Sequence, residues 1–393
     1  AALGNSEPIL AAVVLWAFER HLDGRRDHAL YLGVAAALLR PEAWPFLGLY
    51  GLWLWVYEPH LRVRLVAFAA AVPALWILPE WWGAGDPLRA GSRANAPNPG
   101  SAAFAERPSF ELFKRFAQST VAPVEAGTLV AVGVAAVAWL RRRAQGTPGA
   151  SAGRRPVRSD AVLALAALGF SWFALVAVMT ERGFAGNQRY LMVTTAVVSV
   201  LGGVGAVRVL QGVERLGVRL FGSARAGAIA AATAFFAGLA IASPTIVAKA
   251  DNTGRVQGGI EHEAYLWHDL KALIDANGGK ERLLACGGVF SGPFQTQMVA
   301  YELGIHGINV GWKVTPPPGV AFRTRTVPDG PLVTKPTDDR YRLVDQQGKW
   351  RLLTVPPDGN RAGECPASGP DAPTAPPGGG LGERPVEAIG TRR

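Results

Sequence analysis

The first 247 residues alternate between long apolar runs and short polar segments, and the remaining residues are mostly polar. About 20 apolar residues in a helix are needed to cross the roughly 30 Å apolar core of a bilayer. Four runs meet this length clearly, at 122–140, 160–180, 188–206 and 226–246. Shorter or less regular runs lie at 8–18, 29–57 and 61–78. The pattern predicts seven or eight helical segments of membrane length.

Arginines gather in the short segments between the apolar runs, where they indicate the cytoplasmic side of a membrane. One group lies between the first two clear runs and another between the last two: Arg141, Arg142, Arg143, Arg154, Arg155 and Arg158, then Arg208, Arg215, Arg219 and Arg225. Successive spans cross the membrane in opposite directions. With these two loops in the cytoplasm, the segments 79–121, 181–187 and everything after Val247 lie outside. The chain is therefore predicted to be a multi-pass protein of the plasma (inner) membrane with an extracytoplasmic C-terminal domain.

The run at 29–57 is longer than one span and contains Pro41. Proline suits the first turn of a helix and disfavours helical backbone in the residue before it. One short helix is therefore expected to end near Leu39 and a second to begin at Pro41. Such a hairpin keeps the arginines that precede it on the cytoplasmic side and places the tip, Arg40-Pro41-Glu42, outside. By the same alternation Glu7, which precedes the first apolar run, also lies outside.

The predicted outer segment 79–121 opens with a Trp81-Trp82 pair, which is typical of an anchor at a membrane interface. Three phenylalanines at helical spacing follow later in the segment: Phe110, Phe113 and Phe116. They predict an amphipathic helix over 107–118 that lies on the outer surface. Three polar residues between these features are candidate contacts for an acceptor or a phosphate: Asp86, Arg89 and Arg93.

The polarity change divides the chain into a transmembrane helical domain (1–250), a small α/β domain (251–356) and a Pro- and Gly-rich tail (357–393) that is expected to be disordered. Within the α/β domain the pattern predicts helices at 262–276 and 293–303 and strands at 283–286, 307–311, 321–327, 341–345 and 349–355. The last two strands are expected to pair around Gln347-Gly348. Cys286 and Cys365 are the only cysteines, and the sequence leaves open whether they form the disulfide that an extracytoplasmic domain permits.

Charge and motifs narrow the classes of function. The formal net charge of +10 comes with arginines in short loops rather than on one soluble face, so nucleic acid is not an expected partner. No cofactor motif is visible, and the glycine-rich 202–205 run lies inside a span, where it predicts close helix packing. His262 and His268 miss the spacing of a helical zinc pair, so no metal site is expected. A requirement for a divalent metal stays open.

The excess of arginine over lysine and the abundance of alanine, glycine and valine indicate an actinobacterial-like bacterial source with GC-rich DNA. The chain begins at Ala1, and its first apolar run starts within ten residues without the basic region of a signal peptide. We therefore expect a fragment that lacks its N-terminus.

Charged residues on the predicted outer face carry the candidate chemistry. A charge in mid-membrane costs about 2.5–3.5 kcal/mol on insertion scales, so it is usually retained for a partner. The Arg40 guanidinium presents a fork that fits phosphate, and Glu7 and Glu42 are nearby carboxylates at helix starts. Arg182 and Arg189 lie in a short loop between two spans and offer further phosphate contacts. Helix capping, an interfacial hairpin tip and a solvated turn remain alternative explanations.

Asn5-Ser6-Glu7-Pro8, the Leu39-Arg40-Pro41-Glu42 tip, the long outer loop and the C-terminal outer domain together resemble the GT-C class of membrane glycosyltransferases over roughly residues 1–350. The resemblance implies transfer of a hexose or pentose from a polyprenyl-phosphate donor to an envelope glycan, glycolipid or protein, with inversion at the anomeric carbon. It also implies a donor-phosphate role for Arg40, Arg182 and Arg189, with Glu7 and Glu42 as nearby catalytic carboxylates. The main base of the class is an acidic residue in the first outer loop, which would lie upstream of Ala1.

Two other classes of function stay open. A transporter or flippase would also tolerate charged residues and broken helices, although the sequence shows no internal repeat and no second broken helix. A non-catalytic envelope assembly protein would use its C-terminal domain to bind glycan. Membrane lipids are expected partners in every case, and the sequence does not specify the sugar, the acceptor, the linkage or the oligomeric state.

Overall fold

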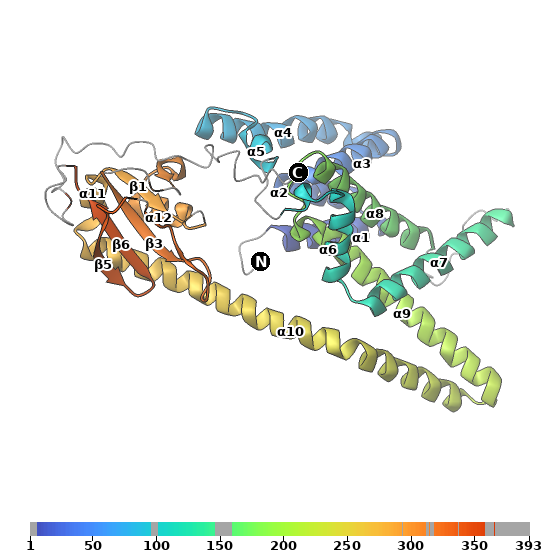
Figure 1. Ribbon diagram of the computed structural model, residues 1–393. Helices are drawn as coiled ribbons and strands as arrows, with labels where there is room; N and C mark the ends of the chain where they lie inside the picture. Colours follow the sequence, from blue (N-terminus) through green and yellow to red (C-terminus); the bar gives the residue numbers. More distant parts are fainter. Residues whose placement is uncertain are drawn as a thin grey trace. The chain divides into compact units, whose positions relative to one another are not determined.

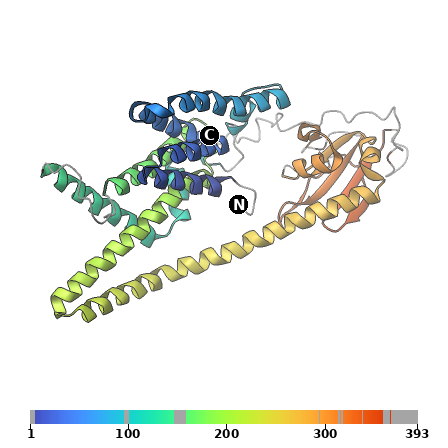
Figure 2. The same cartoon turned by 180° about the vertical axis from the view of Figure 1, so that it is seen from behind.

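The computed structural model describes residues 6–95, 101–145, 159–292, 294–311, 314, 318–336, 338–357 and 365. The chain divides into two compact units, Ala1–Val247 and Ala248–Arg393. The first unit is helical, and the second combines helices with one sheet (Figure 1 and, seen from behind, Figure 2). Helix α10 (Ala224–Ala276) belongs to both units, because the boundary falls within it.

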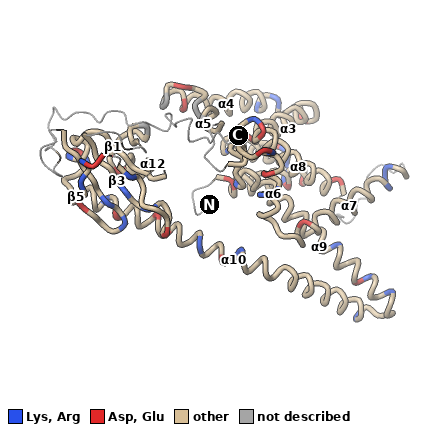
Figure 3. The backbone as a smooth tube through the Cα atoms, viewed as in Figure 1, with Lys and Arg blue, Asp and Glu red and all other residues tan. Residues whose placement is uncertain are grey.

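Five helices are long and apolar enough to cross a membrane. They include α4 (Arg62–Ala84), α7 (Ala122–Ala144), α8 (Ser159–Glu181), α9 (Met192–Phe221) and α10. Residues 226–248 of α10 carry no charged side chain, and Figure 3 shows this part of the helix in tan. The five helices confirm the prediction of a mainly helical protein with membrane-spanning segments. Among the described residues they are fewer than the seven or eight segments predicted, because the apolar helices at 7–22, 26–39 and 44–57 have only 16, 14 and 14 residues.

Helices α9 and α10 extend beyond the predicted spans. Three arginines that were expected in a loop lie on α9 instead: Arg208, Arg215 and Arg219. Only Gly222 and Ser223 separate the two helices, and Gly222 turns the chain with φ +69°, which glycine adopts without strain. The helix predicted at 262–276 is the end of the 53-residue α10. No break occurs before it, because Leu266 and Leu270 anchor this end of α10 in the core of the second unit.

The predicted hairpin of short helices is present. It comprises α2 (Arg26–Leu39), a 3₁₀ turn (Pro41–Ala43) and α3 (Trp44–Tyr57). Pro41 has no N–H, so the carbonyl of Ala37, four residues earlier, lacks its usual helical donor. The indole N–H groups of Trp44 and Trp76 donate to this carbonyl at 3.0 and 3.2 Å. The proline thus ends α2. The Ala37 carbonyl, which lacks a helical donor, instead links the end of α2 to α3 through Trp44 and to α4 through Trp76.

Glycines bring α7 and α9 into direct backbone contact. Gly202 and Gly205 of α9 face α7, and a Cβ atom added at Gly205 would overlap the carbonyl oxygen of Gly127. A Cβ atom added at Gly203 would meet no atom within 4 Å. The close packing predicted for the 202–205 run is therefore observed, since small residues let helix backbones approach one another in a membrane.

Replacing Gly205 by alanine is expected to destabilise the first unit by about 1–3 kcal/mol, because the new methyl group must push α7 away from α9. Gly203→Ala is the matched control, since its methyl group enters open space. Thermal unfolding of both variants in detergent, followed by circular dichroism, measures the difference. Equal melting temperatures would show that the close contact between α7 and α9 does not contribute to the stability of the first unit.

The predicted amphipathic helix is α6 (Pro108–Ser119). Leu112 is fully buried in the first unit, and Phe116 packs against Phe173 of α8 with a ring-centroid distance of 5.8 Å. The N–H of Ser109 donates to Glu181 Oε1 at 2.9 Å and fixes the start of the helix at the end of α8. The helix therefore rests on the bundle through its apolar face.

The second unit contains one mixed sheet. Its strands are β1 (Gly288–Ser291), β2 (Val310–Gly311), β3 (Gly319–Arg325), β4 (Leu332–Val333), β5 (Arg342–Gln347) and β6 (Trp350–Val355). Their order is β2-β1-β3-β6-β5, with β4 paired to β3. β1 is parallel to β2 and β3, whereas β6 is antiparallel to β3 and β5. The hairpin predicted around Gln347-Gly348 is present, and Gly348 turns with φ +50°.

Besides the helix at 262–276, three elements of this unit differ from their predictions. Of the strand predicted at 307–311 only Val310 and Gly311 are in a strand, and Gly307–Asn309 form a 3₁₀ turn. Residues 283–286 end the short helix α11 (Gly279–Leu284) and the turn after it, and the strand begins only at Gly288. Gly287 lies between them with φ +119°, a conformation that no regular strand uses. The helix predicted from Pro293 begins three residues later, as α12 (Thr296–Leu303).

The sheet has two different faces, because successive side chains of a strand point to opposite sides. One face packs against α10 and α12 in the larger core, which includes Leu266, Leu270, Val289, Val299, Phe322, Trp350 and Leu352. The other face carries a smaller apolar cluster, which includes Phe290, Ala321, Tyr341, Leu353 and Val355.

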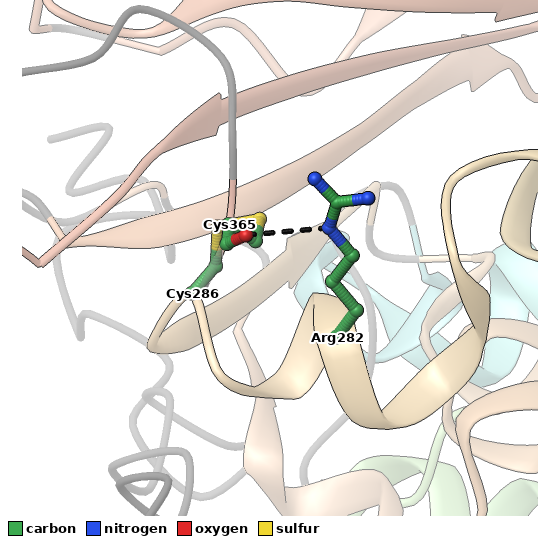
Figure 4. Close-up of a disulfide and its surroundings, with 3 residues drawn as sticks. All are labelled: Arg282, Cys286 and Cys365. Carbon is green, nitrogen blue, oxygen red and sulfur yellow. Dashed lines mark hydrogen bonds between the residues drawn. A yellow bond between two sulfur atoms is a disulfide. The ribbon is translucent and has the colours of Figure 1, made fainter. Parts of the chain in front are cut away.

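Cys286 and Cys365 form a disulfide across a sequence separation of 79, with their Cα atoms 4.9 Å apart. Arg282 of α11 supports it, since its Nε donates to the carbonyl oxygen of Cys365 at 3.2 Å (Figure 4). The pairing that the sequence left open is therefore made. Within 358–393 the structure describes only Cys365, so the predicted disorder of the tail lies outside the described residues.

Candidate functional site

One end of the first unit collects charged side chains from three segments that are far apart in the sequence. Glu7 begins helix α1 (Glu7–Leu22), which packs along α2. Arg40 and Glu42 form the tip of the hairpin between α2 and α3, and Arg189 lies in the 3₁₀ turn that precedes α9. The alternation of spans predicted that these four residues share one side, and the structure brings them into contact.

Glu7 is the centre of this cluster and is only 3% exposed. Arg40 Nη2 donates to Glu7 Oε1, and Arg189 Nε lies 3.4 Å from the same oxygen. Both guanidinium carbons also lie over the ring of Tyr190, at 4.8 and 5.2 Å from its centroid. One buried carboxylate and one aromatic ring therefore hold two arginines side by side, where like charges would otherwise repel.

Glu42 differs from Glu7 in how it is paired. Its side chain is 5% exposed, and its Oε1 lies 3.9 Å from Arg40 Nη1. Its Oε2 is buried and accepts no hydrogen bond from any residue that the structure describes. A buried carboxylate oxygen without a donor is costly, so this atom is a candidate contact for a ligand.

Aromatic packing fixes the base of the cluster. The indole N–H of Trp172 on α8 donates to the carbonyl of Tyr190 at 2.9 Å, and Phe46 of α3 stacks on Trp172 at 5.1 Å. Phe184 contacts Tyr190 from the loop before it, at 4.7 Å between ring centroids. The two arginines are therefore presented by a rigid support that involves α3, α8 and the turn before α9.

An apolar cavity of about 740 Å³ begins beneath this support. It lies among α1, α2, α3 and α8, and Ala43 and Trp172 line its end near the charged cluster. Phe18, Leu47 and Leu168 are among its apolar walls. Its far end is polar, with these side chains: His21, Arg26, Tyr50 and Asp160. The arrangement would match a long apolar chain that carries a charged group at the end nearest the Glu7 cluster.

The opposite end of the unit is rich in paired arginines. Arg26 forms an ion pair with Glu58 and lies over the Trp53 ring at 5.0 Å. Arg142 donates to Ser159 where α7 and α8 approach one another. Three of the described arginines that indicated a cytoplasmic side line one pocket with Ser159 at this end: Arg141, Arg142 and Arg208.

The other predicted site residues do not join the cluster. Arg182 is exposed, and none of its side-chain atoms bonds to a cluster residue. Asp86 is exposed and accepts the backbone N–H of Leu88 at 2.9 Å, so it shapes a turn before α5 (Arg89–Ala94). Arg89 and Arg93 lie on α5, and their side chains are outside the described part of the structure.

Two site residues were missed from sequence. Tyr190 was not among the predicted site residues, and Trp172 lies in the middle of an unbroken apolar run with no local signal. The adjacent Arg189-Tyr190 pair was the available clue, because an arginine beside an aromatic residue can stack on it. Within the described ranges, no group of three His, Cys, Asp or Glu residues is arranged to hold a metal ion.

No protein-family model, no curated protein and no solved structure matches this chain. Its function must therefore be inferred from the site.

Proposed function

We propose that this chain is part of a membrane glycosyltransferase that takes a sugar from a polyprenyl-phosphate donor. The observation that carries the proposal is the pair Arg40 and Arg189, held by buried Glu7. An apolar cavity begins nearby at Ala43 and Trp172. Each guanidinium has five N–H donors, and Glu7 and Tyr190 occupy only part of them. The remaining donors suit a phosphate, and the cavity suits an isoprenoid chain.

The two carboxylates would have different roles in this reaction. Glu7 already accepts a hydrogen bond from Arg40 and forms an ion pair with Arg189, so it positions the two arginines rather than removing a proton. Glu42 has a free buried oxygen, Oε2, beside Arg40 and is the better general base. It would take the proton of the acceptor hydroxyl as that oxygen bonds to the anomeric carbon. The bond to the phosphate oxygen would break, and the arginines would stabilise the phosphate that leaves with the electron pair.

We place the charged cluster on the outer face of the plasma membrane. The arginines of the opposite end support a cytoplasmic location for that end. The Cys286–Cys365 disulfide supports an extracytoplasmic second unit, because such bonds persist in oxidising compartments. An envelope glycan or glycolipid is the acceptor that this location offers.

The test uses the purified chain in lipid nanodiscs with radiolabelled polyprenyl-phosphate hexoses and pentoses and an envelope glycolipid fraction. Transfer of label from the donor to the glycolipid is the expected result. The same chain in sealed vesicles distinguishes the alternatives. Intact donor that crosses the bilayer without cleavage would instead favour a flippase, and bound donor that is neither cleaved nor moved would favour an assembly protein.

Glu42→Gln is expected to lower transfer by roughly 10²–10⁴-fold, because the amide cannot take the acceptor proton. Donor binding should stay within about two-fold of the unchanged protein, since the arginines keep Glu7. Turnover measurements together with equilibrium binding of the donor separate the two effects. Glu214→Gln, an exposed carboxylate of α9, is the control. Full transfer by Glu42→Gln would exclude Glu42 as the base.

A further inference from the structure

The sheet of the second unit holds two arginines directly opposite one another. Arg323 of β3 and Arg351 of β6 are partners in the antiparallel register. Directly opposed residues have Cβ atoms about 4.5–5.5 Å apart, and like charges at such positions destabilise a sheet. Phe322 and Trp350 belong to the core under α10, so the side chains of Arg323 and Arg351 point to the other face.

No carboxylate offsets this repulsion among the described residues. Arg323 Nε is buried and has no hydrogen-bond partner in the part of the chain that the structure describes. Burial lowers the pKa of Arg323, and the neighbouring Arg351 lowers it further. Arg325, two positions along β3, donates to the carbonyl of Gly330 and so is tied to the turn between β3 and β4. The pair is therefore left with uncompensated positive charge on an accessible face.

The third member of the group is Gln346 of β5, which lies opposite Arg351. Its Oε1 accepts from Arg351 Nε at 3.0 Å, so its amide N–H groups remain free to donate. The guanidinium groups of Arg323 and Arg351 and the amide of Gln346 therefore offer only hydrogen-bond donors on this face of the sheet. A carboxylate would neutralise one positive charge, whereas a phosphate carries about −1.5 to −2 at pH 7 and would neutralise both.

We propose that Arg323, Arg351 and Gln346 form a phosphate-binding site on the face of the sheet that points away from α10. The ligand is inorganic phosphate or a phosphate group on a sugar, and both would be recognised by the same donors. The site does not depend on the proposed transfer reaction, because it lies wholly in the second unit.

Isothermal titration of the full chain in detergent tests the site, with inorganic phosphate in one arm and glucose 1-phosphate in the other. Sodium chloride at matched ionic strength removes general screening effects. Saturable phosphate binding is expected, and Arg323→Ala and Arg351→Ala should each weaken it by about ten-fold or more. Tighter binding of glucose 1-phosphate would identify a phosphorylated sugar as the ligand, and equal binding would identify free phosphate.

Two further variants keep the result interpretable. Arg351→Lys retains the charge but loses the fork, so it should also weaken binding. Arg340→Ala removes an arginine that pairs with Asp338 outside the group and should leave binding unchanged. No saturable binding, or equal binding by the Arg323 and Arg340 variants, would overturn the proposal.

Discussion

Replacing Arg40 by alanine is expected to weaken binding of a polyprenyl-phosphate sugar by roughly 10–100-fold, with a matching loss of transfer. The lost interactions are charge-assisted hydrogen bonds to phosphate, which contribute about 1.5–3 kcal/mol each. Arg40→Lys should recover only part of the loss, because an ammonium group lacks the planar fork. Equilibrium binding of labelled donor to the protein in nanodiscs measures the change. The control is Arg215→Ala, an exposed arginine on α9 outside the cluster.

Folding must be separated from binding in this experiment. Arg40→Ala leaves Glu7 buried with only Arg189 as a partner, and breaking a buried ion pair costs about 3–5 kcal/mol. The double variant Glu7→Gln/Arg40→Ala removes the unpaired charge and should recover much of that stability while donor binding stays weak. Donor binding by a folded double variant at the level of the unchanged protein would refute the phosphate role of Arg40.

Removing the disulfide is expected to lower the free energy of unfolding of the second unit by about 4.5 kcal/mol. This value follows from the entropy of closing a loop across a sequence separation of 79. Both cysteines are buried, so the variant should carry serine at both positions to avoid leaving a free thiol. Hydrogen exchange of β1, β3 and β6 in the full chain, followed by mass spectrometry, measures the loss of protection.

A reducing agent provides the matched control for this prediction. It should lower the protection of the unchanged protein to that of the Cys286→Ser/Cys365→Ser variant and have no effect on the variant. Equal protection in all four samples would mean that the sheet and α10 hold the second unit together without the bond.

Local chemistry explains the predictions that succeeded. Pro41 lacks an N–H and restricts the residue before it, so the end of α2 and the hairpin tip could be placed within a residue or two. Long apolar runs specify helices in the same way, because only internal hydrogen bonding satisfies a backbone in lipid. Gly348 marks the β5–β6 turn through its positive φ.

Ambiguity in short segments explains the predictions that failed. The apolar residues at 283–286 fit a strand as well as a helix end, and the core around Leu283 decided for the helix. The stretch 248–261 is polar and carries glycines, and the predicted helix began only at 262. It is helical because it continues α10, whose later turns are anchored in the core of the second unit.

The sequence by itself determined the five long apolar helices, the hairpin at Pro41 and the shared side of Glu7, Arg40, Glu42 and Arg189. Hydropathy and proline chemistry act locally, and the side of each loop follows from counting the spans. Only the tertiary structure decided that Glu7 holds both arginines, that Tyr190 lies under them and that Glu42 Oε2 is left without a donor. It also decided that the two cysteines form a bond and that Arg323 and Arg351 lie opposite one another. These facts depend on packing between segments distant in the chain, which no local pattern encodes.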